Sequence, residues 1–253
     1  MVTRRECSDL WSSPKGLSVL LAFSIALSLL SYLSAGDAAI NLLDARESVG
    51  VVVKTAIGLG TLTALVVSAD AISGERERGT LEALLLTPAQ RDHLVVGKLL
   101  GATTMWIAAL AVTLPFVLVM ADGPGVVVDA LLVLVLAGGL VAAALTALGL
   151  AVSAQVMSNR VSLATSIAIL LLLAAPSQLP AIVKSTTLGP VLVKANPVSA
   201  ALTLADNIVV KQQAWADQWS YLVSPVVAAS GSSRRLIASP RARAAWRGRW
   251  RGQ

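Results

Sequence analysis

The chain has 253 residues, of which 56% are hydrophobic and only 13% carry a charge, and its mean hydropathy is +0.76. Soluble domains carry about 25% charged residues, so this composition excludes an ordinary soluble domain and indicates a protein that crosses a membrane several times. The formal net charge of +6 comes from an arginine-rich C-terminal end and is therefore no sign that the whole protein binds nucleic acid.

Five apolar runs are long enough to cross a bilayer, which takes about 20 apolar residues as a helix. They cover Leu17–Leu33, Val49–Ala71, Leu99–Met120, Val126–Val152 and Val161–Val183. Helix is the expected structure because a strand edge would leave unpaired backbone groups in lipid. We therefore predict an all-α, polytopic helical membrane protein with five complete transmembrane helices.

The first run also has features of a signal peptide, because basic residues precede it and small residues lie near Ala35. A signal core usually has about 7–15 residues, and this run is longer. We therefore interpret it as the first membrane helix and keep the signal peptide as an alternative.

Lysine and arginine in short loops predict which side of the membrane each loop occupies, since they are enriched on the cytoplasmic side. They precede the first span and lie between spans two and three, where Arg76, Arg78, Arg91 and Lys98 are found. We predict a plasma-membrane protein whose N-terminus and second loop are cytoplasmic. The segment Lys184–Asp217 is predicted to lie outside.

The charged segment Glu75–Lys98 separates the second and third spans. Thr80 can cap a short helix in which Leu81, Leu84 and Leu85 form one apolar stripe. Thr87-Pro88 then begins a new helix, with proline at the first helical position, and Gly79 permits a bend before Thr80. A solvated loop with interfacial leucines is the simpler interpretation. The other is a short cytoplasmic helix that docks a soluble partner.

The same segment carries a family signature. The run Glu75–Glu82, together with Leu84-Leu85, Thr87-Pro88 and Gly97-Lys98, resembles the signature of type-2 ABC exporter permeases. The resemblance implies six membrane helices, a homodimer or heterodimer of permease subunits, and two separate ABC ATPase subunits. It also implies that this loop couples the ATPases to the membrane helices. The partner-coupling residues that it indicates are Glu75, Arg76, Glu77, Arg78, Gly79, Thr80, Leu81, Glu82, Leu84, Leu85, Thr87 and Pro88.

No residues of the chain indicate catalysis or a bound cofactor. Gly97-Lys98 is not part of a phosphate loop, because Asp92 and Leu99 stand where that motif needs glycine and serine or threonine. ATP is therefore expected on the partner ATPase subunit. His93 and Cys7 are single residues of their kinds, which excludes a two-histidine metal motif and a cysteine-rich site. We predict a transport subunit and not an enzyme.

The C-terminal end departs from the family pattern. The apolar stretch Trp219–Ala229 is too short to cross, so we predict a truncated sixth helix. We assign residues 1–229 to an ABC-2 type transmembrane domain and residues 230–253 to a basic, disordered tail. The abrupt change in composition is also typical of a frameshift-derived end. Membrane lipids are expected partners, and nucleic acid is not.

The predicted function is therefore a membrane-spanning permease subunit that moves an unknown substrate, by export, using ATP hydrolysed on separate subunits. The alternative is a non-transporting membrane scaffold or sensor that recruits a cytoplasmic partner through residues 75–92. An adjacent ATPase gene would favour transport. The sequence does not indicate the substrate.

Overall fold

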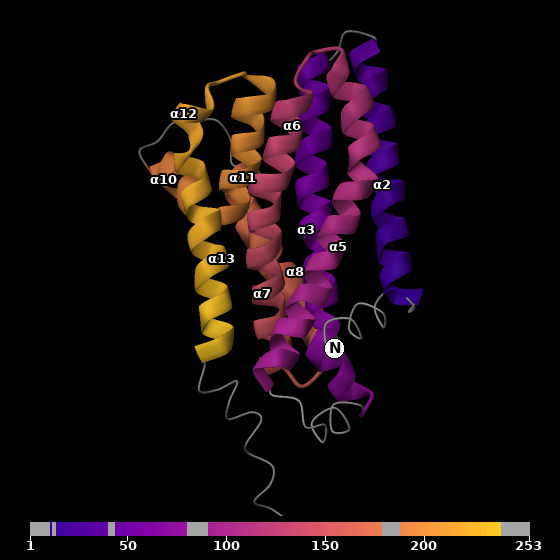
Figure 1. Ribbon diagram of the computed structural model, residues 1–253, viewed down its shortest axis with the longest axis vertical. Helices are drawn as coiled ribbons and strands as arrows, with labels where there is room; N and C mark the ends of the chain where they lie inside the picture. Colours follow the sequence, from indigo (N-terminus) through magenta and orange to yellow (C-terminus); the bar gives the residue numbers. More distant parts are fainter. Residues whose placement is uncertain (1–10, 12–13, 40–43, 80–90, 179–187, 239–253) are drawn as a thin grey trace, which may run out of the picture.

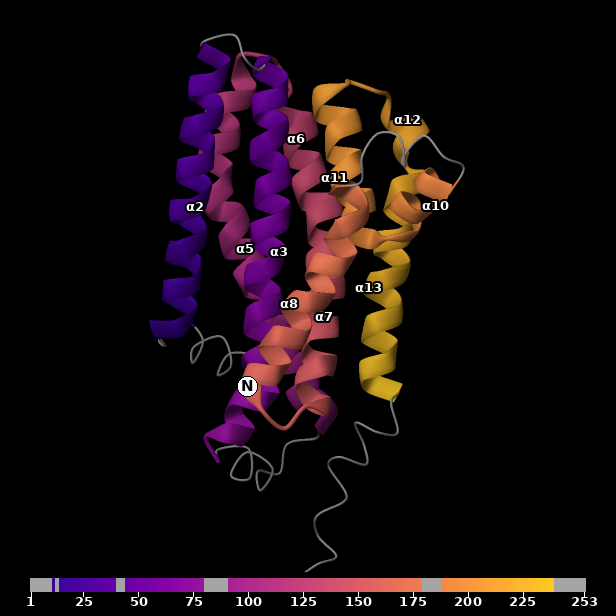
Figure 2. The same ribbon diagram turned by 180° about the vertical axis from the view of Figure 1, so that it is seen from behind.

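The computed structural model describes residues 11, 14–39, 44–79, 91–178 and 188–238. These residues form an elongated bundle of roughly parallel and antiparallel helices (Figures 1 and 2), and no strand occurs among them. Five helices are long and apolar enough to cross a membrane, and they span Gly16–Gly36, Ala45–Glu77, Val95–Asp122, Val127–Gln155 and Asn159–Gln178. The five predicted spans are confirmed.

The first three spans are the long helices α2, α3 and α5. Their bounds are Pro14–Ala39, Ala45–Glu77 and Arg91–Asp122. The fourth span consists of α6, a π-helical turn η1 and α7, with bounds Val127–Val133, Leu134–Gly138 and Gly139–Gln155. The fifth consists of α8 (Asn159–Ala174), which ends in a short 3-10 turn, η2 (Ala175–Gln178).

A set of shorter helices follows the fifth span. These are α10 (Leu188–Ala195), α11 (Pro197–Ala205), the π-helical turn η3 (Asp206–Val210) and α12 (Trp215–Gln218). The sequence predicts that this segment lies outside the membrane. Its side of the membrane stays a prediction. In the structure α11 packs into the bundle, with Ala200, Ala201 and Leu204 fully buried, because its small and aliphatic side chains fit closely against neighbouring helices.

The last helix, α13 (Ser220–Ala238), is longer than the sequence predicts. Its 19 residues would extend about 28 Å, against a hydrocarbon core of about 30 Å. It crosses the expected boundary at residue 229 and returns the chain to the end of the bundle where α2 begins (Figures 1 and 2). It is not among the five helices apolar enough to span.

Helix α3 lies at the centre of the bundle. In its most apolar stretch 61% of the residues are buried, against 22% in α2 and 17% in α8. Its apolar side chains Val52, Ile57 and Leu65 are completely enclosed. The outer helices α2 and α8 expose leucine and isoleucine side chains, as lipid-facing helices do.

Trp106 of α5 is held between two glycines of neighbouring helices. A Cβ atom at Gly60 of α3 or at Gly138 of η1 would lie 2.6 Å from the Trp106 ring. The indole therefore fills space that only glycine leaves open. The π-helical turn that contains Gly138 lies at this contact, and such turns often mark a local adjustment of an α-helix.

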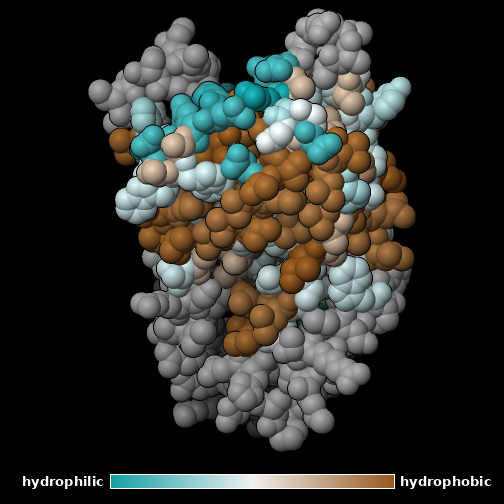
Figure 3. All heavy atoms as spheres, turned by 45° about the horizontal axis from the view of Figure 1, so that its top comes forward, coloured by the Kyte–Doolittle hydropathy of each residue, from teal (hydrophilic) through white to brown (hydrophobic). Residues whose placement is uncertain are grey.

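The two ends of the bundle differ in what they expose. Hydrophilic side chains gather at the end where α3 begins, above a band of hydrophobic ones (Figure 3). At the opposite end, α3 finishes beside the start of α5 and the turn between α7 and α8 (Figures 1 and 2). Glu75 to Gly79, the described part of the predicted coupling segment, lie at this second end.

Candidate partner-coupling site

The structure describes part of the predicted coupling segment. Glu75 to Gly79 are described, whereas Thr80, Leu81, Glu82, Leu84, Leu85, Thr87 and Pro88 lie outside the described residues. The short helix predicted there, and the helix start at Thr87, also lie outside them. Gly79 has a φ of +70°, a backbone conformation that favours glycine at the end of a helix and that the predicted bend requires.

Helix α3 continues further than the sequence predicts on both sides. It begins at Ala45, because the Glu47 side chain accepts a hydrogen bond from the Asp44 backbone amide (3.4 Å) and caps the first turn. It ends at Glu77, so that Glu75, Arg76 and Glu77 form its last turn and are not loop residues. Glutamate and arginine are good helix formers, and all three side chains have partners on neighbouring helices.

Glu75 joins the end of α3 to the start of α5. Its Oε1 accepts a hydrogen bond from Lys98 Nζ at 2.5 Å. The Lys98 side chain is only 4% exposed, so Lys98 is an enclosed ion-pair partner. Because a buried pair is sensitive to the loss of either charge, this contact fixes α3 against α5 where the chain leaves and re-enters the bundle.

Arg76 and Glu77 join the end of α3 to the turn between α7 and α8. The Arg76 guanidinium donates to the carbonyl oxygens of Val156 (2.6 Å) and Ala154 (3.4 Å). Glu77 Oε1 accepts from the Ser158 hydroxyl (3.0 Å) and the Asn159 backbone amide (2.7 Å). A carboxylate at the first turn of α8 also complements the helix dipole.

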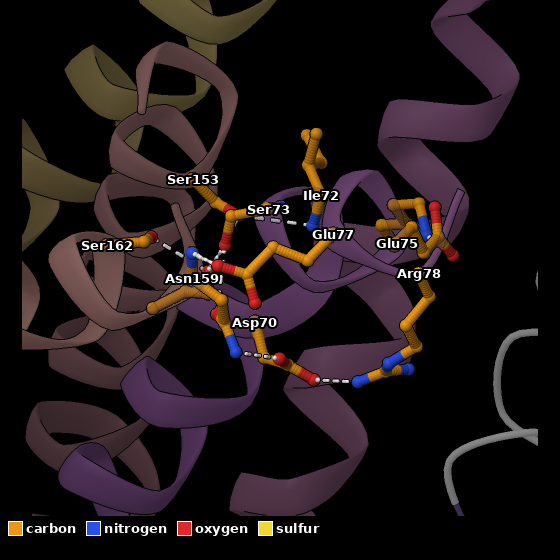
Figure 4. A network of polar contacts seen from close by, with 11 residues as sticks. Asp70, Ile72, Ser73, Glu75, Glu77, Arg78, Ser153, Asn159 and Ser162 are labelled. Carbon is orange, nitrogen blue, oxygen red and sulfur yellow. Dashed lines mark hydrogen bonds and ion pairs between the residues drawn. The ribbon is translucent and has the colours of Figure 1, made fainter. Parts of the chain in front are cut away.

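About two turns before Glu77, Asp70 lies at the centre of a second set of contacts, shown in Figure 4. Its two oxygens accept from Asn159 Nδ2 (2.6 Å) and from the Arg78 guanidinium (3.1 Å). Asn159 Oδ1 accepts in turn from the Ser73 hydroxyl (3.0 Å). Asp70 and Asn159 therefore link α3 to α8.

Ser153 of α7 and Ser162 of α8 bind the backbone of α3. Ser153 Oγ accepts from the amides of Ile72 (3.1 Å) and Ser73 (2.9 Å), and the Ser162 hydroxyl donates to the Ala69 carbonyl (2.8 Å) (Figure 4). Such contacts require close approach of the helices, and Gly149 provides it. A Cβ there would lie 3.0 Å from the Leu65 backbone oxygen.

We call this set of contacts the α3 clamp. Its members are Asp70, Ser73, Glu75, Arg76, Glu77, Arg78, Lys98, Ser153, Asn159 and Ser162. Glu75 to Arg78 were predicted from the sequence as coupling residues, whereas Asp70 and Lys98 were not among them. Asp70, Ser73 and Glu77 recur at helical spacing on one face of α3, so their spacing in the sequence could have indicated a shared polar face. Nothing in the sequence marks Asn159 as their partner.

The described residues contain no group of three or more His, Cys, Asp and Glu side chains placed to hold a metal ion. The α3 clamp consists of hydrogen bonds and ion pairs within the chain, in which charged groups and several hydroxyls join α3 to α5, α7 and α8.

Comparison of the sequence with known protein families gives a match over most of the chain. A family model described as "ABC-2 family transporter protein" matches residues 11–240. The chain belongs to the ABC-2 family of transporter proteins. The match covers all five spans and α13, so the resemblance carried by the Glu75–Lys98 segment extends over most of the chain.

A curated relative gives a shorter match. The chain is 38% identical over 55 residues to the ABC transporter permease protein NatB of Bacillus subtilis (strain 168), which corresponds to 22% of this chain and 14% of that protein. The match therefore spans only a small part of the relative's length. The five apolar spans and the family together establish a multi-pass membrane protein.

Proposed function

We propose that the chain is the membrane-spanning permease subunit of an ABC transporter, and that it exports its substrate with energy from ATP hydrolysed on separate ATPase subunits. Family membership supports the permease role. The curated relative is likewise named an ABC transporter permease protein. A second permease subunit, of the same or another sequence, would complete the pathway. In this arrangement the N-terminus and the Glu75–Lys98 segment face the cytoplasm.

The observation that carries the proposed coupling role is the α3 clamp. Glu75 attaches the last turn of α3 to α5, and Arg76 and Glu77 attach it to the α7–α8 turn. A displacement of the segment that follows Gly79 would therefore move the ends of several spans together and not α3 alone. This is what alternating access requires, because the ATPase must favour one arrangement of the helices over another.

The docking surface would be the apolar stripe Leu81, Leu84 and Leu85, with Glu82 beside it. Substituting Leu84 with aspartate should abolish the stimulation of ATP hydrolysis that the permease gives to its ATPase, since a docking anchor is typically worth about 2 kcal/mol or more. Leu84→Met keeps the size and the apolar character and serves as the matched control. Ala216→Asp introduces the same charge at the opposite end of the bundle, at an exposed position of α12.

The assay has two readouts. The first is co-purification of the ATPase with the permease, and the second is ATP hydrolysis by the ATPase, measured with and without the permease in nanodiscs. We expect Leu84→Asp to lose both co-purification and stimulation, and both controls to keep them. Retention of both by Leu84→Asp would refute the docking role. If the chain recruits a cytoplasmic partner that hydrolyses no ATP, and no ATPase co-purifies with the wild-type chain, it acts as a membrane scaffold.

A further inference from the structure

A cavity of about 780 Å³ lies between α3 and the later helices, away from the α3 clamp. Its lining residues come from α2, α3, α8, η2, α10, α11, η3 and α13, together with Lys211, which follows η3. A volume of this size falls within the range of about 300–1,000 Å³ that is usual for small-molecule sites. Nothing in the proposed coupling role uses it.

One side of the cavity carries a charged group of three residues. Asp206 Oδ1 lies 3.0 Å from Lys54 Nζ, and Asp206 Oδ2 lies 3.1 Å from Lys211 Nζ. These are the charged residues among those that line the cavity, so the group has one more positive than negative charge. The side chains are 32–53% exposed, which leaves the ammonium groups accessible to a ligand.

Lys54 lies on the same face of α3 as Val51, Thr55 and Gly58, all of which line the cavity. This spacing of three and four residues is one side of a helix. Lys54 thus points its ammonium toward Asp206 of η3, which is 152 residues away in the chain.

The remainder of the lining combines aliphatic side chains with the polar side chains of Thr55, Ser177, Gln178 and Thr203. Leu30, Leu59, Val193 and Leu202 contribute to it, together with the ring of Tyr221. Gly58 adds open space, since a Cβ atom built there would meet no other atom within 4 Å. The cavity therefore offers an apolar volume with a positive group on one side.

The position of the charged group in the bundle suits a ligand that has a charged group at one end and an apolar chain. Lys54 lies nine residues after the first residue of α3, or about 13 Å along the helix axis. Hydrophilic side chains gather at the end of the bundle where α3 begins, above a band of hydrophobic ones (Figure 3). A molecule bound here could keep a charged group near that boundary and an apolar chain within the cavity.

We propose that this cavity binds an amphiphile with a single anionic group, a carboxylate or phosphate, that pairs with Lys54 and Lys211, while its apolar chain lies against α3 and α11. Each ammonium has three N–H donors, so an anion can be bound without displacing Asp206. Asp206 holds the two lysines together and limits the excess charge to one. A neutral amphiphile would lose the charge-assisted hydrogen bonds.

The test uses the purified full-length chain in nanodiscs of zwitterionic lipid, with no ATPase present. The probe is dansylaminoundecanoic acid, whose fluorescence rises in an apolar site, and its primary amide is the uncharged control. We expect the acid to bind about tenfold more tightly than the amide, the effect of one charge-assisted contact. Equal affinity of the two probes would overturn the proposal.

Charge substitutions predict effects of opposite sign. Lys54→Gln and Lys211→Gln should each weaken binding of the acid several-fold and leave binding of the amide unchanged. Asp206→Asn should tighten binding of the acid, because the site then has two uncompensated positive charges. A general loss of structure would weaken binding in all three variants. Weaker binding in Asp206→Asn would therefore count against the proposed role of the charges.

A pair of glycine-to-leucine substitutions tests whether the probes occupy the apolar volume of the cavity. Gly58→Leu places a side chain in the cavity and should abolish binding of both probes, and leucine is well tolerated within a helix. Gly36→Leu is the control, because Gly36 also has open space around it but does not line the cavity. Unchanged binding in Gly58→Leu would show that the probes bind elsewhere.

Mass spectrometry of the protein purified from native membranes distinguishes two sources of the ligand. An anionic lipid that co-purifies with the wild type and is lost in Gly58→Leu supports a membrane lipid as the occupant. Binding of the acid with no co-purified lipid supports a soluble amphiphile. Failure of ATPase stimulation would refute the proposed transport function and leave this binding result intact, so the two can be separated.

Discussion

Asn159 gives the sharpest test of the α3 clamp, because its side chain has a defined orientation between two α3 residues. Its Nδ2 donates to Asp70 (2.6 Å), and its Oδ1 accepts from Ser73 (3.0 Å). Asn159→Ala removes both contacts. A hydrogen bond to a charged group contributes about 1.5–3 kcal/mol and a neutral one about 0.5–1.5 kcal/mol. Because the residue is partly exposed, we expect a loss of stability of about 2 kcal/mol.

Asn159→Asp should be worse than the alanine substitution, although it preserves the shape of the side chain. The oxygen that replaces Nδ2 would place a second carboxylate against Asp70, and two like charges repel at this distance. Adding Asp70→Asn should recover most of the loss, because the amide introduced at position 70 can then donate to the carboxylate introduced at position 159. The ion pair with Arg78 would be lost, but Arg78 is half exposed and such pairs contribute only about 0–1 kcal/mol.

The assay is thermal unfolding in detergent, followed by helical circular dichroism, for the wild type, the two single Asn159 variants, Asp70→Asn and the double variant. The coupling energy from this cycle should favour the exchanged pair. An Asn159→Asp variant as stable as the wild type, or a double variant that is no better than Asn159→Asp, would refute the arrangement of hydrogen bonds described for this site.

Three further predictions follow from the packing and topology. Gly149→Ala should lower the stability by about 1–3 kcal/mol, because the new methyl group meets α3. The control Gly123→Ala should have little effect, since Gly123 has open space around it. Equal effects of the two substitutions would show that α3 and α7 are less closely packed. In a Cys7→Ser background, an impermeant thiol reagent should label Asp44→Cys and Lys194→Cys from outside intact cells but not Arg78→Cys or Arg91→Cys, and the reverse pattern would invert the orientation. Deletion of residues 239–253 should leave membrane insertion and thermal stability unchanged. Deletion of residues 230–253 should lower thermal stability, because it removes the last turns of α13. Indistinguishable unfolding curves for the two deletions would show that these turns contribute nothing.

The number of spans was predictable because it depends on local composition alone. A run of about 20 apolar residues has one stable structure in a bilayer, whatever its neighbours are. The family was predictable for a similar reason, since its signature lies within one continuous segment, Glu75–Lys98. Helix ends were less accurate. The last turn of α3 is charged, which resembles a loop in the sequence, and it remains helical because Arg76 and Glu77 bind the α7–α8 turn.

The tertiary structure alone decided which distant residues meet. Asp70 is 89 residues from Asn159 in the chain, and Lys54 is 152 residues from Asp206. Hydropathy determines which segments enter the membrane, but it carries no information about which helices become neighbours or how each is rotated. That choice depends on close packing at particular small residues, such as Gly149 against α3 and the two glycines around Trp106. The sequence by itself therefore determined the class of protein and its spans, whereas the α3 clamp and the charged cavity exist only in the folded bundle.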